Sequence, residues 1–250
     1  MGPRIFSKQA LVSGAELELD SNAAKHIQVL RMQPSQPVTL FDGRGGDYAA
    51  SITAMHKAGV QVKVGAQRSI EREPALAVHL VIGMPANERM DWLVEKATEL
   101  GVSSITPVHT ERTVVRLKDD RAAKRREHWQ SIAVAACEQC GRNRVPTIHP
   151  VQNLAAWLSE CDPARTDMQF RVLSFQGESL VPAPDPLGSV KSHGAMCFLI
   201  GPEGGLSPSE EALAIQRGLI PTSLGARILR AETAALAALA CVTYGSGYSQ

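Results

Sequence analysis

The first seventy residues contain short apolar runs that alternate with polar residues, which is the pattern of strands that bury one face. Val60, Val62 and Val64 alternate with polar residues, and further apolar pieces lie at residues 38–41 and around Ile52. These runs are too short and too regularly interrupted to indicate long helices. They predict several adjacent β-strands.

One short helix is expected among these strands. Ser21 or Asn22 is a suitable N-cap, an apolar run follows at residues 26–32, and Pro34 ends the segment. The glycine-rich stretch at residues 42–46 provides a turn between two of the strands. Together these features predict a small β-barrel.

The pattern changes after residues 68–74, a charged segment that ends in proline and reads as a linker. From there strands and helices alternate, which predicts a largely parallel sheet covered on both faces and an α/β fold class. We therefore expect two domains, at residues 1–70 and 71–250. Strands are expected at 76–82, 104–108, 169–175, 196–200 and 219–224, helices at 90–100, 121–140, 154–158, from 208 and from 232, and an irregular loop at 177–193.

The stretch from 196 to 239 contains two successive strand, loop and helix units. Gly201, Gly204 and Gly205 leave the main chain open to a ligand, and Ser207 is a suitable N-cap for the next helix. Loops beyond the carboxyl ends of strands are where open α/β sheets bind ligands. The glycines match neither a phosphate loop nor a dinucleotide fingerprint, which disfavours nucleoside triphosphatases and dehydrogenases. A tight turn without a ligand is the alternative.

Composition limits the class of protein further. The chain has 250 residues, 44% of them hydrophobic, which is enough for a packed core. It has no apolar run of membrane-spanning length and its first ten residues lack a signal-peptide core, so we expect a cytosolic protein without membrane association. Five scattered cysteines fit reduced thiols. Cys137 and Cys140 lack further ligands at zinc spacing, so we expect packing roles and no metal site.

Charge is unevenly distributed along the chain. The formal net charge is only +1, yet residues 112–144 hold nine Lys or Arg against four Asp or Glu, a local excess of five. A basic segment in a nearly neutral chain favours a polyanionic partner such as nucleic acid. A solvated helix face is the alternative.

Several segments together are similar to one known family. They are HIQVLRM, LFDGRGGDY, EKATELGVSSITPV, HTERTVV, WQSIAVAACEQCGRNRVP, FLIGPEGGLSPSE and LGARILRAETAAL. In this order they resemble the RsmE-type methyltransferases of bacterial 16S ribosomal RNA, which belong to the SPOUT class. The resemblance implies an N-terminal PUA-like barrel, an α/β domain with a deep trefoil knot, S-adenosylmethionine as methyl donor, and a homodimer with the active site near its interface. It also implies methylation of a uridine in the 30S ribosomal subunit at N3.

The two glycine-bearing loops, together with a third loop that the resemblance adds at residues 173–175, give the expected cofactor site. Its residues are Leu173, Leu199, Ile200, Gly201, Pro202, Glu203, Gly204, Gly205, Leu224, Gly225, Ile228, Leu229 and Arg230. For catalysis we expect Arg230 to hold a uracil oxygen or a flanking phosphate, and Glu232 to orient or deprotonate the base. Glu203 is the other carboxylate candidate. The alternatives are a first-turn helix acid for Glu232 and turn capping for Glu203.

Basic residues on both domains are the expected RNA contacts. They are Arg4, His26, Arg31 and Arg44 on the barrel, and Arg112, Arg142 and Arg144 on the catalytic domain. His26 could equally pack inside the barrel, and Asn143 could bind a base or cap a turn. Two other functions remain open at this point: a SPOUT 2′-O-ribose methyltransferase, and a ribosome-binding module without catalysis.

Overall fold

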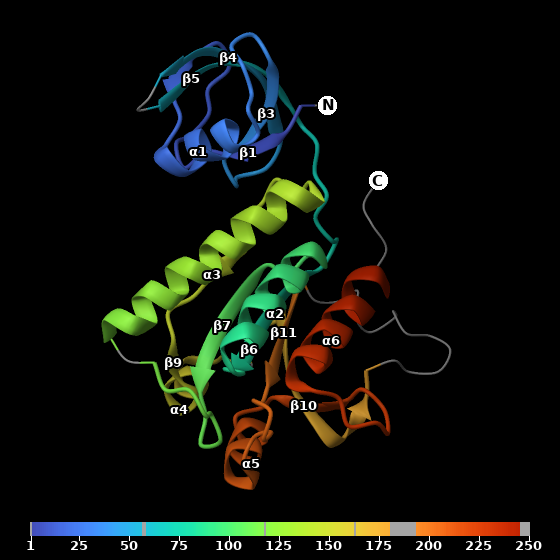
Figure 1. The fold of residues 1–250 in the computed structure, drawn as a ribbon. Coiled ribbons are helices and arrows are strands. Elements are labelled where there is room, and N and C mark those ends of the chain that lie inside the picture. The colour runs from blue at the N-terminus through green and yellow to red at the C-terminus, as the bar shows by residue number, and fades with distance from the viewer. Residues whose placement is uncertain (1, 57–58, 118, 163, 181–193, 246–250) are drawn as a thin grey trace. The chain divides into compact units, whose positions relative to one another are not determined.

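A computed structural model of the chain describes residues 2–56, 59–117, 119–162, 164–180 and 194–245, and it forms two compact units (Figure 1). The first unit comprises Met1–Glu73 together with Val134–Val145, and the second comprises Pro74–Ala133 together with Pro146–Gln250. The first division therefore falls inside the segment that the sequence indicates as a linker. The sequence pattern did not predict that residues 134–145 belong to the first unit.

The first unit is built on a five-stranded sheet in the order β1-β3-β4-β5-β2. β1 and β3 are parallel, and the other neighbours are antiparallel. Its core contains Ile5, Ile27, Leu40 and Ile52. The elements are β1 (Arg4–Phe6), β2 (Glu16–Glu18), α1 (Ser21–Val29), β3 (Pro37–Phe41), β4 (Asp47–His56) and β5 (Gly59–Arg68).

Two details of this unit differ from the sequence prediction. The N-cap of α1 is Asp20, whose carboxylate accepts from the amides of Asn22 and Ala23, rather than Ser21 or Asn22. A carboxylate in this position satisfies two free amides at once and also favours the helix dipole. The strand β1 was not predicted, because three residues are too few to show alternation.

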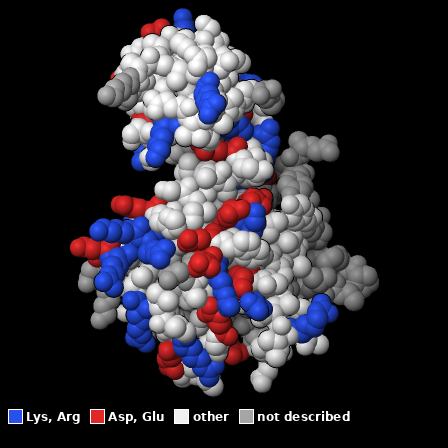
Figure 2. All heavy atoms as spheres, in the orientation of Figure 1, with Lys and Arg blue, Asp and Glu red and all other residues white. Residues whose placement is uncertain are grey.

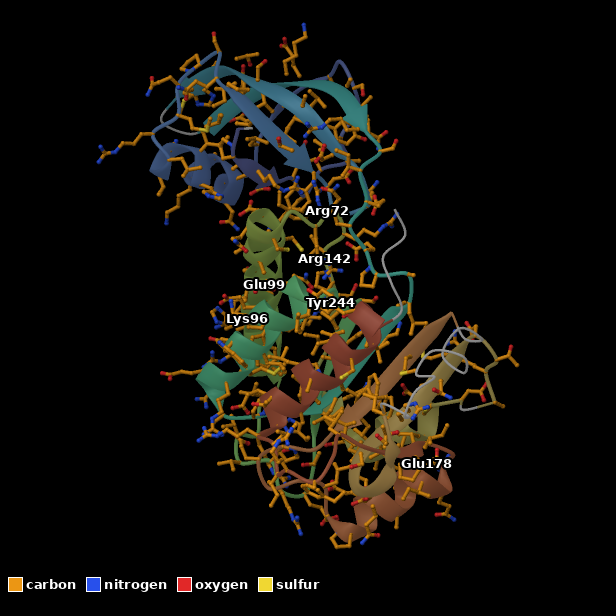
Figure 3. The ribbon with its side chains drawn as sticks, turned by 90° about the vertical axis from the view of Figure 1, so that its right-hand side faces the viewer. Arg72, Lys96, Glu99, Arg142, Glu178 and Tyr244 are labelled. Carbon is orange, nitrogen blue, oxygen red and sulfur yellow. The ribbon has the colours of Figure 1, made fainter. Side chains whose placement is uncertain are left out.

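Within the first unit, residues 134–145 contact the N-terminal segment through polar groups. The amide of Phe6 donates to Glu138 Oε1 at 2.9 Å, and Arg72 donates to the carbonyl of Gly141 at 2.9 Å (Figure 3). Gly141 ends the preceding helix with a φ of +88°, a conformation that favours glycine. Cys137 is buried there, and burial raises the pKa of its thiol to about 12, which fits a packing role.

The second unit is an α/β fold whose strands are all parallel. Its sheet has the order β12-β10-β11-β6-β7-β8, and β9 also pairs with β7. The elements are β6 (Ala77–Gly83), α2 (Asn87–Glu99), β7 (Ser104–His109), α3 (Asp119–Cys140), β8 (Thr147–Ile148), β9 (Gln152–Asn153), α4 (Leu154–Glu160), β10 (Met168–Ser179), β11 (Ala195–Ile200), α5 (Pro208–Gln216), β12 (Ile220–Ser223) and α6 (Ala231–Gly245).

Helices cover this sheet in two groups. α2 and α6 pack against each other, and α6 contacts β6 and β11 (Figure 1). α4 contacts β7 and α5 contacts β10, and their residues share a separate core cluster with Val81 and Leu199. On its outer surface α2 carries the ion pair of Lys96 with Glu99, 2.8 Å apart (Figure 3). This layered arrangement is the one expected for a parallel sheet.

One expected loop is in part a strand. The irregular segment predicted at 177–193 begins inside β10, which continues to Ser179 and pairs there with β12. Gly177 allows this, because a Cβ there would collide with the main chain of Pro221 and Thr222. Residues 181–193 lie outside the described part of the chain. Among the described residues, no helix has the length and apolar composition needed to cross a membrane.

Candidate active site

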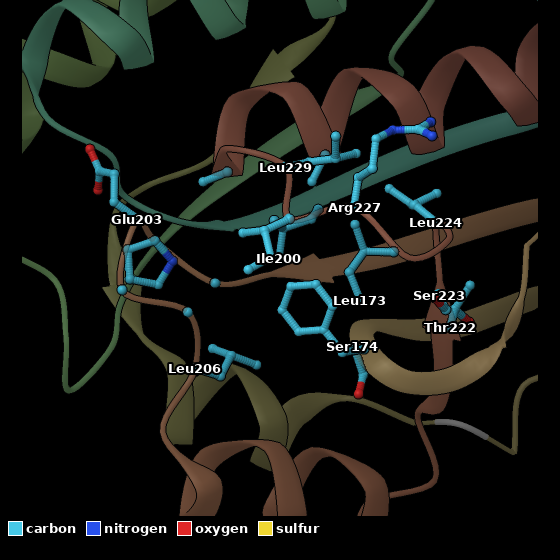
Figure 4. A pocket seen from close by; sticks show the side chains of 18 of the residues that line it. Leu173, Ser174, Ile200, Glu203, Leu206, Thr222, Ser223, Leu224, Arg227 and Leu229 are labelled. Carbon is cyan, nitrogen blue, oxygen red and sulfur yellow. The ribbon is translucent and has the colours of Figure 1, made fainter.

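A cavity of about 250 Å³ lies at the carboxyl ends of β11 and β12, between the loops that follow them and residues 173–175 of β10 (Figure 4). Two of the predicted cofactor residues do not line it: Leu199 is buried within β11, and Arg230 is exposed beside the cavity. The other predicted residues do line it: Leu173, Ile200, Gly201, Pro202, Glu203, Gly204, Gly205, Leu224, Gly225, Ile228 and Leu229. The two glycine-bearing loops therefore share one concave site with residues 173–175, which lie within strand β10 rather than in the third loop that the resemblance implies.

The loop after β11 is folded so tightly that glycine is needed in it. A Cβ on Gly201 would lie 2.5 Å from the amide nitrogen of Leu206, and Gly205 has a φ of +69°. The amide of Gly205 donates to the carbonyl of Pro202 at 2.8 Å. The bend brings main-chain atoms to the cavity wall without side chains in the way.

The helix after this loop starts as the sequence predicts. Ser207 caps α5 through its hydroxyl, which accepts from the amide of Glu210, and the amide of Ser207 donates in turn to the Glu210 carboxylate. Pro208 occupies the first turn. This capping box fixes the point at which the loop ends.

Two carboxylates and one arginine form a cluster at the cavity edge. Glu203 accepts from the amide of Ala86 at 2.9 Å and from Arg89 Nη1 at 3.2 Å. Arg89 Nε also lies 4.0 Å from Glu232 Oε1. The Glu232 side chain is only 10% exposed, and its Oε2 has no hydrogen-bond partner among the described residues. A buried carboxylate oxygen without a donor is costly, so this oxygen is suited to a donor on a ligand.

Several residues at this site were not predicted from the sequence. Arg89 joins Glu203 and Glu232, but a lone arginine in the first turn of a helix carries no local signal. Thr222 and Arg227 also line the cavity. Thr222 could have been found from its place at the end of a strand that leads into a ligand loop.

Four of the predicted RNA contacts are held by partners within the chain. Arg4 donates to Asp47 at 3.0 Å and to Asn143 at 2.6 Å. Arg142 is only 4% exposed and donates from Nε to Glu73 at 3.1 Å. Arg144 pairs with Glu71 at 3.1 Å, and Arg112 donates to the carbonyl of Gly204 at 2.7 Å.

The placement of Arg4 and Arg142 favours structural roles over direct contact with RNA. Asn143 is likewise buried, and its side-chain amide donates to the carbonyl of Ile70, which favours a structural role for it as well.

The remaining predicted contacts lie at the surface of the first unit. Arg31 and Arg44 are exposed. His26 Nδ1 lies 3.2 Å from Glu138 Oε2, and its side chain is 39% exposed. Burial raises the pKa of Glu138, while the Phe6 amide and His26 oppose that effect. His26 therefore has both a partner in the chain and an accessible edge.

A parallel sheet with a cavity at the carboxyl ends of its strands, preceded in the chain by a small β-rich unit, fits the class of RNA methyltransferases with a PUA domain. A family model described as an RNA methyltransferase domain matches residues 71–243, and one described as an RNA methyltransferase PUA domain matches residues 19–65. The second unit is an RNA methyltransferase domain and the first is PUA-like. Within this class, the chain belongs to the ribosomal RNA small subunit methyltransferase E family.

The relatives match almost the full length of the chain. The ribosomal RNA small subunit methyltransferase E of Bacillus subtilis is 30% identical, covering 96% of this chain and 94% of its own. The solved structure of the enzyme of that name from Neisseria gonorrhoeae, bound to S-adenosyl methionine, is 35% identical, with a TM-score of 0.87 and 96% of both chains covered. A Legionella pneumophila protein in complex with the cofactor SAM is 34% identical, with a TM-score of 0.86 and 98% of both chains covered.

Proposed function

We propose that this chain transfers a methyl group from S-adenosylmethionine to N3 of a uridine in 16S ribosomal RNA of the small ribosomal subunit. The observation that carries the proposal is the cavity formed by the loops after β11 and β12 together with residues 173–175 of β10. Its support is the family to which the chain belongs, together with the two relatives described as bound to S-adenosylmethionine. We place this activity in the cytosol, where ribosomal subunits are assembled.

The residues of the cavity fit this cofactor. An adenosine and a cationic sulfonium need close main-chain contact and apolar walls rather than a phosphate cradle, and the loops at 201–205 and 224–229 provide both. Bound there, the cofactor would supply an electrophilic methyl carbon. Glu203 at the cavity edge adds a carboxylate near a cationic ligand, although it is already bonded to Ala86 and Arg89.

Glu232 and Arg230 are the residues we assign to the uracil. The N3 nitrogen of uracil is mostly protonated at neutral pH and must lose its proton before it can act as a nucleophile. Glu232 Oε2 has no donor among the described residues and would accept the N3 proton. Arg230 is exposed in the loop after β12, and it would hold a uracil oxygen, which gains negative charge as the proton leaves. Glu203 is the second candidate for the base.

For RNA binding we propose the exposed cations Arg31 and Arg44, with His26 beside them. Phosphate contacts of this kind set affinity and make it salt-dependent. On the face of the second unit drawn in Figure 2, Lys and Arg side chains are mixed with Asp and Glu. Affinity there would depend on particular cations rather than on a broad positive field.

We also propose that the enzyme is a homodimer. The sequence resemblance implies this state, and Ile228 on the last cofactor loop is 86% exposed, which is unusual for a large apolar side chain beside a ligand site. Light scattering after size exclusion tests the proposal: a mass of one chain, 26.8 kDa, at micromolar concentration would contradict it.

The activity is tested by labelled methyl incorporation into 30S subunits from a strain that lacks the modification. Nucleoside analysis of the product then locates the methyl group. We expect N3-methyluridine. Methyl on a ribose hydroxyl would support the 2′-O-methyltransferase instead, and absence of S-adenosylmethionine binding by calorimetry would support a ribosome-binding module without catalysis.

A further inference from the structure

Arg112 joins the segment after β7 to the loop at residues 201–206. Its Nη1 donates to the carbonyl of Gly204 at 2.7 Å and to the carbonyl of Leu206 at 3.2 Å. These carbonyls lie on either side of Gly205, the residue with a φ of +69°. One guanidinium group therefore holds both ends of the bend.

The stem of Arg112 also packs against this bend. A Cβ placed on Gly204 would lie 3.3 Å from Cβ of Arg112 and 3.4 Å from its Cδ. The missing side chain of Gly204 thus leaves room for the arginine. This close approach keeps the guanidinium group next to the two carbonyls.

The segment that carries Arg112 is itself fixed. The amide of Glu111 donates to Glu210 Oε1 at 2.8 Å, and Glu210 is the capping-box residue of α5. The amide of Thr110 donates to the buried hydroxyl of Thr113 at 2.9 Å. Arg112 is therefore held between two anchored points and is not a freely rotating surface side chain.

We propose that Arg112 is a positioning residue for the cofactor loop, an inference that rests on the proposed function. It fixes the carbonyls of Gly204 and Leu206, and with them the loop amides, in the arrangement that receives S-adenosylmethionine. A loop fixed before binding loses less entropy when the ligand arrives, which increases affinity. The sequence pattern assigned Arg112 to RNA on charge alone, and the two assignments predict different measurements.

The first measurement is the Kd of S-adenosylmethionine by calorimetry for Arg112→Ala and for Arg116→Ala. Arg116 is a matched control: it is an exposed arginine in the same segment, and it has no hydrogen bond or ion pair within the described residues. We expect Arg112→Ala to raise the Kd about tenfold, in line with the loss of a charged hydrogen bond. Arg116→Ala should leave it unchanged. Arg112→Lys keeps a donor within reach and should restore most of the affinity.

The second measurement is hydrogen exchange without any ligand. The amide of Gly205 is bonded inside the loop, so we expect its exchange to become faster in Arg112→Ala but not in Arg116→Ala. Unchanged exchange together with an unchanged Kd would overturn the inference, and so would a loss of RNA affinity alone. If the wild-type protein fails to bind S-adenosylmethionine, the proposed function fails, while the exchange experiment still tests the positioning of the loop.

Discussion

At the scale of single residues, Glu232 combines burial with an oxygen that lacks a donor. We predict that Glu232→Gln lowers kcat at least about 100-fold, because general base catalysis commonly contributes that much. The Kd of S-adenosylmethionine should stay within twofold, since Glu232 does not line the cavity. Single-turnover methylation and calorimetry measure the two quantities.

A matched control separates catalysis from a helix-dipole effect. Glu88 occupies the first turn of α2 as Glu232 occupies the first turn of α6, and Glu88 is exposed. If Glu232 only favours the dipole, Glu88→Gln and Glu232→Gln should both leave turnover intact and change stability by about 0.3–1 kcal/mol. Equal turnover in the two variants would remove Glu232 from the mechanism.

Arg230 and Arg227 differ in their position relative to the cavity, and this difference allows a test of the role of Arg230. Arg227 lines the cavity and Arg230 does not, although both belong to the loop after β12. We predict that Arg230→Ala abolishes turnover, by about 100-fold or more, with cofactor affinity largely intact. Arg227→Ala should instead weaken cofactor binding. Wild-type turnover in Arg230→Ala would show that the assignment of Arg230 is wrong.

At the scale of elements, the start of α5 depends on the Ser207 cap. We predict that Ser207→Ala lowers the free energy of unfolding by about 1 kcal/mol, because a free amide of the first turn loses its acceptor. Urea unfolding measures this. Ser131→Ala is the control, since that exposed hydroxyl only bonds back to Glu127 within α3. Equal stabilities of the two variants would contradict the prediction.

His79, near the start of β6, makes the stability of the fold dependent on pH. His79 is half-buried, and its Nδ1 lies 2.8 Å from the Ser104 hydroxyl. Burial, assisted by His149 and Arg165, lowers the pKa of His79 below 6.5. In the unfolded chain His79 therefore takes up a proton near pH 6.5, whereas in the folded chain it is protonated only at lower pH. Stability contributed by neutral His79 is present above pH 6.5 and is lost as pH falls toward the folded pKa.

We accordingly predict that the free energy of unfolding is smaller at pH 5.5 than at pH 7.5, with a slope from this group of at most about 1.4 kcal/mol per pH unit. His79→Gln should reduce this dependence. Urea titrations at both pH values measure it. An identical pH dependence in wild type and variant would exclude His79 as the group responsible.

Features set by residues that are close in sequence could be predicted, and contacts between residues that are far apart in sequence could not. The cap at Ser207 and the glycine bend are set by residues within a few positions, and the sequence indicates both. The contact of Arg89 with Glu203 joins residues 114 positions apart, and no local pattern records it. The trefoil knot that the resemblance implies stays a prediction, because it concerns the path of the whole chain.

At the scale of the whole molecule, α3 belongs to two units. Residues 134–145, which include its last turns, belong to the first unit and contact its N-terminal segment through Arg142, Asn143 and Glu138. The family models describe two consecutive domains, yet the N-terminal one is completed by a segment from the middle of the second. The stability of the first unit therefore depends on residues 134–145, which a fragment that ends near position 70 would lack.

Arg142 and Arg144 test this dependence because they differ mainly in burial. The Arg142 side chain is 4% exposed and pairs with Glu73, whereas the Arg144 side chain is 55% exposed and pairs with Glu71. Removing one partner of a buried pair costs about 3–5 kcal/mol, and removing an exposed one costs about 0–1 kcal/mol. We predict that Arg142→Ala speeds hydrogen exchange in β1, β3 and β4 strongly and that Arg144→Ala does so only slightly. A stable Arg142→Ala protein with weakened RNA affinity would contradict the structural role and indicate a direct contact with RNA.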